Sequence, residues 1–157
     1  VMGGAEPEIV VGTGKGGIPE VRIFSTTGKL LQSFIAGDRN LTGGLRLSLL
    51  DIDHSTRRQT AEILITRQSG SPEGIITDYR GTIRRRFQVY YPSFKGDVKV
   101  TTADINQDGT KEIISFPGPG GGPHIKFFTH LGDFQQSFYA YSPQFTGGVN
   151  ATIFYTH

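Results

Sequence analysis

The sequence lacks cysteine and tryptophan and contains a single methionine. The absence of cysteine excludes disulfide frameworks and thiolate metal sites, but it leaves the cellular compartment open, because reducing and oxidising environments both tolerate such a chain. Long apolar runs are also missing. The longest, at residues 8–11 and 61–65, fall far short of the roughly 20 residues that a membrane-spanning helix needs. We therefore expect no membrane insertion.

A strong excess of one charge is absent as well. The chain has 16 Lys and Arg against 14 Asp and Glu, a net charge of +2 that is too small to indicate a nucleic-acid partner, despite a pI near 9.0. The one basic cluster is Arg84–Arg86. Because side chains alternate between the two faces of a strand, these three arginines cannot all point to one surface. We interpret the run as a solvated strand face, with an anion site as the alternative.

What the chain does contain favours β structure. It has 22 Gly, 8 Pro, 6 Tyr and 11 Phe in 157 residues, a mixture that supplies turns and pleated-sheet residues rather than long helices. A chain of this length can bury roughly 68–70% of its unfolded surface, so one domain with a substantial core is the default expectation.

The sequence is an internal repeat. The turn glycines Gly28, Gly81 and Gly132 are separated by 53 and then 51 residues, and a phenylalanine six residues further on repeats with the same spacing. Glu-Ile pairs open an apolar run in each copy, and the small change of register falls in a loop between residues 53 and 62, where insertions are tolerated. We therefore divide the chain into units of about 1–53, 54–104 and 105–157.

Each unit predicts four short strands, most clearly in the third copy. Its strands are expected at residues 98–103, 112–116, 124–129 and 134–141, with hairpin signals between them. Short four-stranded antiparallel sheets with glycine-rich turns are typical of β-propeller blades. We predict an all-β chain of about three blades that forms one propeller segment over residues 1–157, either an incomplete ring or a ring completed by oligomerisation. A β-sandwich and a solenoid are the alternatives.

Two segments resemble a known family. Residues 104–113 (DINQDGTKEI) and 118–126 (GPGGGPHIK) are similar to the signatures of FG-GAP or VCBS repeats, the blades of integrin-like β-propellers, and the similarity extends over nearly the whole chain. The resemblance implies a calcium-binding loop between an inner strand at 98–104 and its neighbour at 112–116. It also implies that the chain begins at a second strand near Glu8 and ends with an inner strand at 149–155, which would complete the blade begun at the other end.

The spacing of oxygen-bearing side chains in this loop favours Ca²⁺. Acidic or amide side chains at positions 1, 3 and 5 point inward together when Gly109, at position 6, permits a sharp turn, and a further carboxylate follows at position 9. The backbone carbonyl at position 7 is an additional candidate. The predicted calcium ligands are Asp104, Asn106, Asp108, Thr110 and Glu112. The alternative is a plain polar hairpin whose carboxylates are solvated.

The equivalent loops depart from this pattern. After Asp51 and Asp53, residues 54–58 contain no Asp-Gly and add two positive charges that oppose cation binding. At the third junction Tyr155 replaces Asp104, and residues 1–4 supply no carboxylate. We therefore expect one calcium site.

Other motifs point to structure rather than to chemistry. The glycine cluster 12–17 lacks the spacing of a phosphate loop and matches a hairpin turn. The four histidines (His54, His124, His130 and His157) lack metal-ligand spacing and are expected in turns or at the surface. No local catalytic arrangement is present, so we expect no enzyme. The aromatic segments 90–94 and 139–145 suit either sugar stacking or packing between blades, and their recurrence favours packing.

Propellers need 4–8 blades, so three copies cannot close a ring. We expect either additional blades from the same protein or a homo-oligomer, such as two three-bladed halves. The leading hypothesis is a secreted or cell-surface module for adhesion or recognition, stabilised by calcium, with a protein or glycan ligand. A propeller that binds or processes carbohydrate is the first alternative. A structural subunit of an extracellular assembly is the second.

Overall fold

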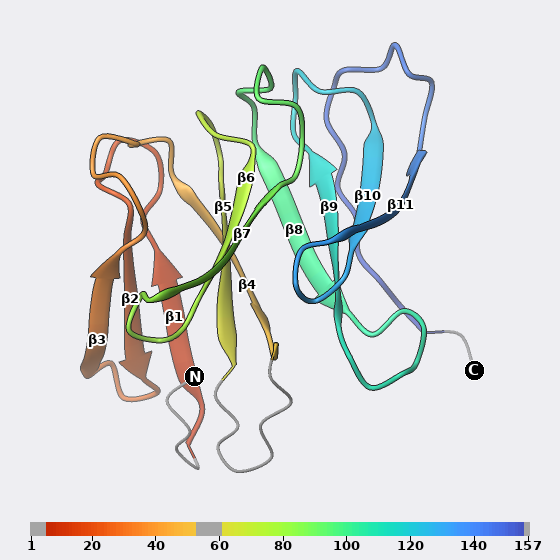
Figure 1. Ribbon diagram of the computed structural model, residues 1–157. Coiled ribbons are helices and arrows are strands. Elements are labelled where there is room, and N and C mark those ends of the chain that lie inside the picture. The colour runs from red at the N-terminus through yellow and green to blue at the C-terminus, as the bar shows by residue number, and fades with distance from the viewer. Residues whose placement is uncertain (1–5, 53–60, 156–157) are drawn as a thin grey trace.

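The structure, a computed structural model, describes residues 6–52 and 61–155, which form eleven strands in three antiparallel sheets. The sheets lie side by side in chain order (Figure 1). The N-terminal sheet contains β1 (Glu8–Gly12), β2 (Glu20–Ser25) and β3 (Leu30–Ile35). The middle sheet contains β4 (Leu45–Leu50), β5 (Glu62–Arg67), β6 (Glu73–Thr77) and β7 (Ile83–Gln88). The C-terminal sheet contains β8 (Val98–Ala103), β9 (Glu112–Pro117), β10 (His124–Phe128) and β11 (Phe134–Tyr139).

Each sheet is a meander in which consecutive strands pair, so the prediction of an all-β chain is confirmed. Within the described ranges no helix is found, and thus none that is long and apolar enough to cross a membrane. The sheets are offset from the sequence units, because β4 comes from the end of the first unit and pairs with β5 of the second. The predicted pairing of residues 98–104 with the strand at 112–116 is present as β8 and β9.

The predicted inner strand at residues 149–155 is not a strand in the structure. A strand needs a neighbouring backbone edge for its ladder, and among the described strands β1, the expected partner, pairs only with β2. The segment instead lies beside β8. The Lys99 ammonium group donates a hydrogen bond to the carbonyl oxygen of Val149 (3.0 Å), and the Tyr155 hydroxyl donates to that of Asp104 (3.0 Å).

The three sheets share an irregularity at the same position. The ladder shifts register between Ile23 and Phe24, between Ile76 and Thr77, and between Phe127 and Phe128. A bulge of this kind bends a strand and increases its twist. The bulge lies in β6, in β10 and in β2, which takes the same place in the three-stranded N-terminal sheet. The sequence repeat is therefore also a repeat of backbone geometry.

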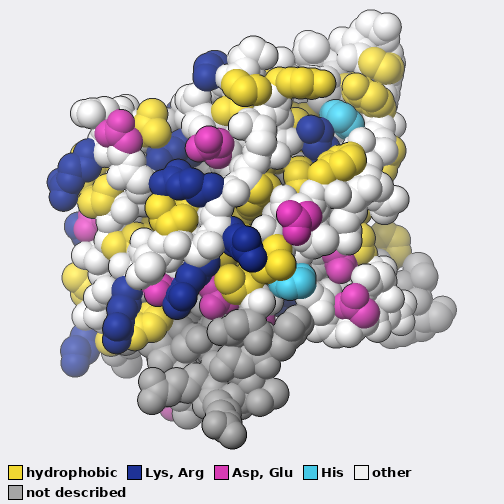
Figure 2. All heavy atoms as spheres, viewed as in Figure 1, with side chains coloured by type: hydrophobic (Ala, Val, Ile, Leu, Met, Phe, Trp, Pro, Cys, Tyr) yellow, Lys and Arg dark blue, Asp and Glu magenta, His cyan; other side chains and the backbone are white. Residues whose placement is uncertain are grey.

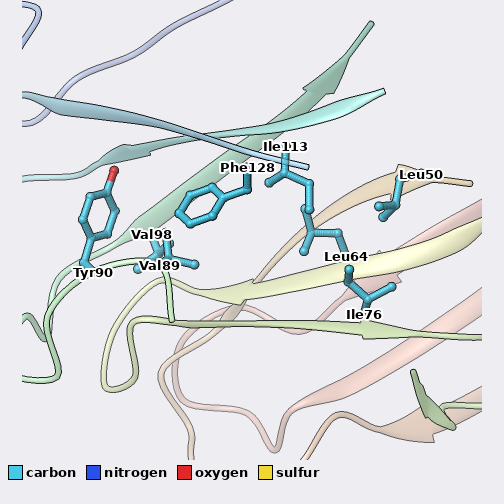
Figure 3. Packing of buried hydrophobic residues seen from close by; sticks show 8 residues of the cluster. All are labelled: Leu50, Leu64, Ile76, Val89, Tyr90, Val98, Ile113 and Phe128. Carbon is cyan, nitrogen blue, oxygen red and sulfur yellow. The ribbon is translucent and has the colours of Figure 1, made fainter. Parts of the chain in front are cut away.

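Two apolar cores lie between the sheets. The first joins the N-terminal and middle sheets through Val21, Ile23, Ile63 and Ile65 and their neighbours. The second joins the middle and C-terminal sheets and includes eight buried residues: Leu50, Leu64, Ile76, Val89, Tyr90, Val98, Ile113 and Phe128 (Figure 3). Because the middle sheet contributes to both cores, every residue of β5 is buried. The sheets are thus held together by their faces.

A ring-on-glycine contact repeats between successive sheets, and we call it the Phe–Gly joint. A Cβ atom added to Gly81 would lie 2.5 Å from the ring of Phe34, and one added to Gly132 would lie 2.5 Å from the ring of Phe87. Both glycines also have positive φ, 86° and 88°. The joint therefore requires glycine twice over, for the turn and for the close approach of the neighbouring sheet's ring.

At the outer face of each terminal sheet, only one of the two partners of the Phe–Gly joint is present. In the N-terminal sheet, a Cβ atom on Gly28 would meet nothing within 4 Å. In the C-terminal sheet, the ring of Phe138 is 52% exposed. Ile9 and Val11 of β1 are also exposed, whereas Ile63 and Ile65, which occupy the same positions in β5, are buried. At the C-terminal end the outer face is partly covered, because Val149 and Ile153 pack with Ile114, Phe116 and Ile125 in a third apolar cluster. The exposed parts are Ile9 and Val11 at one end of the row and Phe138 at the other.

Candidate functional site

The predicted calcium loop connects β8 to β9. Two residues in it have left-handed backbone conformations, Gln107 with a φ of 61° and Gly109 with a φ of 91°. Few residues other than glycine, asparagine and aspartate adopt this region readily. The pair reverses the chain within a few residues, so that the side chains before and after the turn face the same space.

Asp104 closes the loop through the backbone. Its Oδ1 atom accepts a hydrogen bond from the Asp108 N–H (3.1 Å), and its Oδ2 atom accepts one from the Gly109 N–H (2.9 Å). Each carboxylate oxygen has a second lone pair, so these bonds use only part of its acceptor capacity.

Asp108 and Asn106 face each other across the turn. The Thr110 N–H donates to Asp108 Oδ1 (2.8 Å), and the amide group of Asn106 donates to Asp108 Oδ2 (2.9 Å). These two donors, with the Thr110 backbone first, hold the pKa of Asp108 below its usual value. The same Asn106 amide donates to Glu112 Oε1 (3.3 Å).

Glu112 is buried, and its second oxygen has a structural partner. The Ile105 N–H donates to Glu112 Oε2 (3.0 Å). In the middle sheet, the Ile52 N–H donates to Glu62 Oε2 at the same distance, 3.0 Å. The repeated glutamate therefore fastens the start of the loop in a copy without the Asp-Asn-Asp pattern as well as in the copy with it.

The donor set fits a hard cation by its chemistry. Carboxylate and amide oxygens are the ligands that Ca²⁺ prefers, and oxygens of Asp108 and Glu112 converge on one point, at the Asn106 amide nitrogen. Across residues 6–52 and 61–155, no three carboxylate or imidazole side chains form a metal-binding group by themselves. The carboxylates of Asp104, Asp108 and Glu112 would therefore need the Thr110 carbonyl and the Asn106 side chain, whose Oδ1 atom accepts a hydrogen bond from the Asp108 N–H (3.0 Å), to complete the ligands of a bound ion. The ion would supply positive charge to a loop that now satisfies its carboxylates largely with its own N–H groups.

The five predicted ligand residues lie in one loop of the structure, but the equivalent loops of the other copies are only partly described. Asp53, residues 54–58 and residues 1–4 lie outside the described residues, as do His54 and His157. Tyr155, the counterpart of Asp104, is described and contacts the backbone of Asp104 instead of extending the acidic set. The prediction of a single calcium site stays a prediction.

A second feature is a cavity of about 420 Å³ at the end of the molecule formed by the loops before β8 and β10. Tyr90, Tyr91 and Phe94 line one side, and His124, Lys126 and Tyr139 line another. Figure 2 shows a histidine and a basic side chain among hydrophobic side chains near the upper end of the molecule.

The aromatic residues around this cavity have divided roles. In the segment 90–94, Tyr90 and Phe94 pack as predicted, with ring centroids 5.5 Å apart, and Tyr90 belongs to the buried core. In the segment 139–145 the prediction of packing between blades is wrong, because Tyr141 and Phe145 are 63% and 44% exposed. Tyr91 is 80% exposed and Tyr139 is 54% exposed. The sequence does not tell which of these aromatic residues is buried, because side chains in a loop follow no regular alternation.

The polar groups of the cavity are ordered by short contacts. Lys126 Nζ donates to the Val89 carbonyl (3.0 Å) and lies 5.1 Å from the centroid of the Tyr90 ring. The His124 ring stacks on Tyr139 with centroids 4.6 Å apart. Burial, and then the nearby Lys126, lower the pKa of His124, and burial lowers the pKa of Lys126 and raises that of Tyr90. His124, expected as a turn or surface histidine, is thus part of a cavity wall.

Two other predicted features are simple structural elements. The arginine run lies on the exposed outer strand β7, where Arg84 is 3.3 Å from Asp78 and Arg86 is 4.0 Å from Glu73. Exposed pairs of this kind contribute little to stability. The glycine cluster 12–17 connects β1 to β2 in an antiparallel hairpin, as predicted, and opens no helix.

Comparison of the sequence with known protein families finds no match, and comparison with curated protein sequences also finds none.

Proposed function

We propose that the three sheets are blades of a β-propeller of the FG-GAP or VCBS type, and that the chain is a calcium-stabilised, non-enzymatic module for adhesion or recognition outside the cell or at its surface. The observation that supports the propeller is the Phe–Gly joint. The same two positions meet at both junctions, which supports a repeated placement of successive sheets, and a placement repeated with equal rotations generates a ring or a superhelix.

The inner strands support the same arrangement. The Arg46 guanidinium on β4 forms a two-pronged pair with Asp97, next to β8, at 3.1 and 2.6 Å. Lys99, one repeat further on, reaches the Val149 carbonyl and the Asn150 side chain. The same position therefore links each inner segment to the next, as expected for strands placed around a common axis.

The proposed role of calcium is structural. Three carboxylates lie within nine residues of the 104–112 loop, and an ion would offset their mutual repulsion. Extracellular calcium-binding modules work with weak sites, with dissociation constants of roughly 10⁻⁴–10⁻³ M, because calcium is abundant there. An exposed loop of this size is consistent with that class, which is why we place the module outside the cell.

A calcium-dependent melting experiment tests this function. At a calcium concentration about 100 times the dissociation constant, binding adds about 2.7 kcal/mol. For a chain of this size that corresponds to a rise in melting temperature of roughly 5–10 °C over the value in chelator. Asp108→Asn should abolish most of the rise.

The matched control is Asp78→Asn, since Asp78 also accepts backbone N–H bonds in a hairpin turn, from Arg80 and Thr82. This variant should keep the full calcium response. An equal melting temperature of the unmodified chain in calcium and in chelator would refute the calcium-stabilised module.

Two alternatives have support of their own. The exposed rings of Tyr91 and Tyr139 beside the 420 Å³ cavity favour a carbohydrate-binding propeller. The exposed parts of the outer faces of the terminal sheets favour a structural subunit, whose partners would be further blades or a second copy. Binding to immobilised glycans distinguishes the first alternative, and concentration-dependent polymers distinguish the second.

A further inference from the structure

The two junctions between sheets offer an internal comparison, because each has a cavity at the same place in the repeat. At the first junction this place holds two cavities, of about 170 and 290 Å³, and at the second a single cavity of about 420 Å³. In the repeat frame, Gly37 and Asp38 of the first correspond to Tyr90 and Tyr91 of the second. The two junctions thus present one position of the repeat with different side chains.

The 170 Å³ cavity at the first junction is lined by a buried arginine. The Arg67 guanidinium donates to the carbonyl oxygens of Ala36 (2.9 Å) and Leu41 (3.1 Å). Asp38 and Glu73 also line this cavity, so its positive charge is balanced by carboxylates. The guanidinium at the first junction is therefore satisfied by groups of the chain itself.

The cavity at the second junction lacks that arginine. Pro117 occupies the position of Arg67, at the end of the second strand of its sheet, and cannot reach across. The basic group comes instead from Lys126, in the position of Ile75, and it binds the carbonyl of Val89, the counterpart of Ala36. The corresponding carbonyl groups, of Ala36 and Val89, thus accept a hydrogen bond at both junctions. At the second junction, however, no guanidinium is among the residues that line the cavity.

Charge in the open cavity has one sign. Lys95 and Lys126 line it, and no Asp or Glu is among its lining residues. The nearest acidic residue in sequence, Asp97, is already paired with Arg46 at 2.6 Å. The Val89 carbonyl takes one of the three ammonium hydrogens of Lys126, which leaves donors for a ligand.

The same cavity offers flat apolar surface. Tyr91 projects from the loop with 80% of its surface exposed, and Tyr139 is held in place by stacking on His124. Rigid aromatic rings next to hydrogen-bond donors provide contact area for the apolar face of a sugar while leaving its hydroxyl groups to polar partners. A cavity of this volume lies within the range of small-ligand sites.

We infer that the cavity between the middle and C-terminal sheets binds an acidic saccharide, with the sugar ring against Tyr91 and Tyr139 and its carboxylate toward Lys126 and Lys95. This inference rests on the proposed function, since it assigns a ligand class to the recognition module. It concerns only the second junction, because the first has Gly37 and Asp38 in place of Tyr90 and Tyr91 and carboxylates beside its arginine.

The test compares acidic sugars with neutral counterparts. Trigalacturonate is paired with its methyl ester and 3′-sialyllactose with lactose, and binding is followed by NMR chemical shifts of the amide and aromatic groups. A hydrogen bond to a charged group contributes about 1.5–3 kcal/mol, so at least one acidic probe should bind about tenfold or more tightly than its neutral partner. The shifts should centre on Tyr91, Tyr139 and Lys126.

Variants identify the groups responsible. Tyr91→Ala alters an exposed ring and should weaken binding without lowering the melting temperature, and Lys95→Met should weaken the acidic probe but not the neutral one. Lys29→Met, at an exposed lysine outside the lining, is the matched control and should bind normally. The inference is overturned if neither acidic probe binds, if acid and neutral forms bind equally, or if Tyr91→Ala has no effect.

The titrations are run both in calcium and in chelator. If the chain binds no acidic sugar but its melting temperature still rises in calcium, only this inference is refuted. Sugar binding with no calcium effect on melting would instead remove calcium stabilisation and leave the saccharide site in place.

Discussion

At the scale of single residues, glycine has two separate reasons to be present in this chain, and the repeat allows them to be separated. Gly28 and Gly132 occupy the same turn position with φ values of 83° and 88°. Only Gly132 is in contact with a ring from the neighbouring sheet. The difference between the two sites therefore isolates the contribution of the Phe–Gly joint from that of the turn.

We expect Gly28→Ala to destabilise the chain by about 1–2 kcal/mol, the cost of a left-handed alanine. Gly132→Ala should cost about 1–3 kcal/mol more, because its Cβ atom would overlap the Phe87 ring at 2.5 Å. Urea denaturation of both variants measures the difference. Equal midpoints would show that the ring moves away at no cost and that the joint does not fix the sheets.

At the scale of elements, Arg67 at the end of β5 connects the middle sheet to the loop after β3. It is buried and donates to two carbonyl groups, and burial lowers its pKa below the usual arginine value, although nearby Asp38 opposes this. Arg67 therefore links the middle sheet to the loop after β3, and its removal would take this donor from the carbonyl groups of Ala36 and Leu41.

Arg67→Met should therefore lower the free energy of unfolding by about 1.5–3 kcal/mol, the range for hydrogen bonds to a charged group. Arg85→Met, on the exposed strand β7, is the control and should change it by less than about 0.5 kcal/mol. Thermal or urea unfolding provides the measurement. An unchanged free energy of unfolding in Arg67→Met would mean that water replaces the guanidinium and that Arg67 does not stabilise the junction.

Strands were the most predictable elements. The four predicted in the third copy match β8 to β11 closely, because alternation and Gly-rich turns are local signals. The segment 149–155 was predicted as a strand and is not one, since pairing depends on a distant edge that local sequence does not specify. The five predicted ligand residues lie together in the 104–112 loop because they are close in sequence, and their role as calcium ligands stays a prediction. The cavity, in contrast, is lined by Pro117 of β9, Lys126 of β10 and Tyr91 from the loop before β8, a combination that only the packed sheets define.

At the scale of the whole molecule, the two outer faces are the unfinished part. The N-terminal sheet exposes Ile9 and Val11, and the C-terminal sheet exposes Phe138, while Gly28 offers an open position for a ring. These are the two halves of the contact that already joins neighbouring sheets. We therefore expect a second copy of this chain, or further sheets of the same kind, to dock head to tail through these faces.

We expect the isolated chain to associate as its concentration rises, with native mass spectra containing multiples of 17.1 kDa. Phe138→Ser and Ile9→Lys should each weaken the association, because each lies on one of the two complementary faces. Ile83→Ser is the control, since Ile83 is an exposed apolar residue of the middle sheet. A chain that stays monomeric and folded at high concentration would contradict head-to-tail docking.

The Phe–Gly joint also bears on how such a protein changes over generations. Each repeat carries the ring for its successor and the glycine for its predecessor, so duplication or loss of one whole repeat in the gene creates matching surfaces on both sides at once. No compensating substitution is needed at the new boundary. A change in repeat number is thus compatible with this contact, while the side chains at each junction can differ, as Arg67 and Pro117 do.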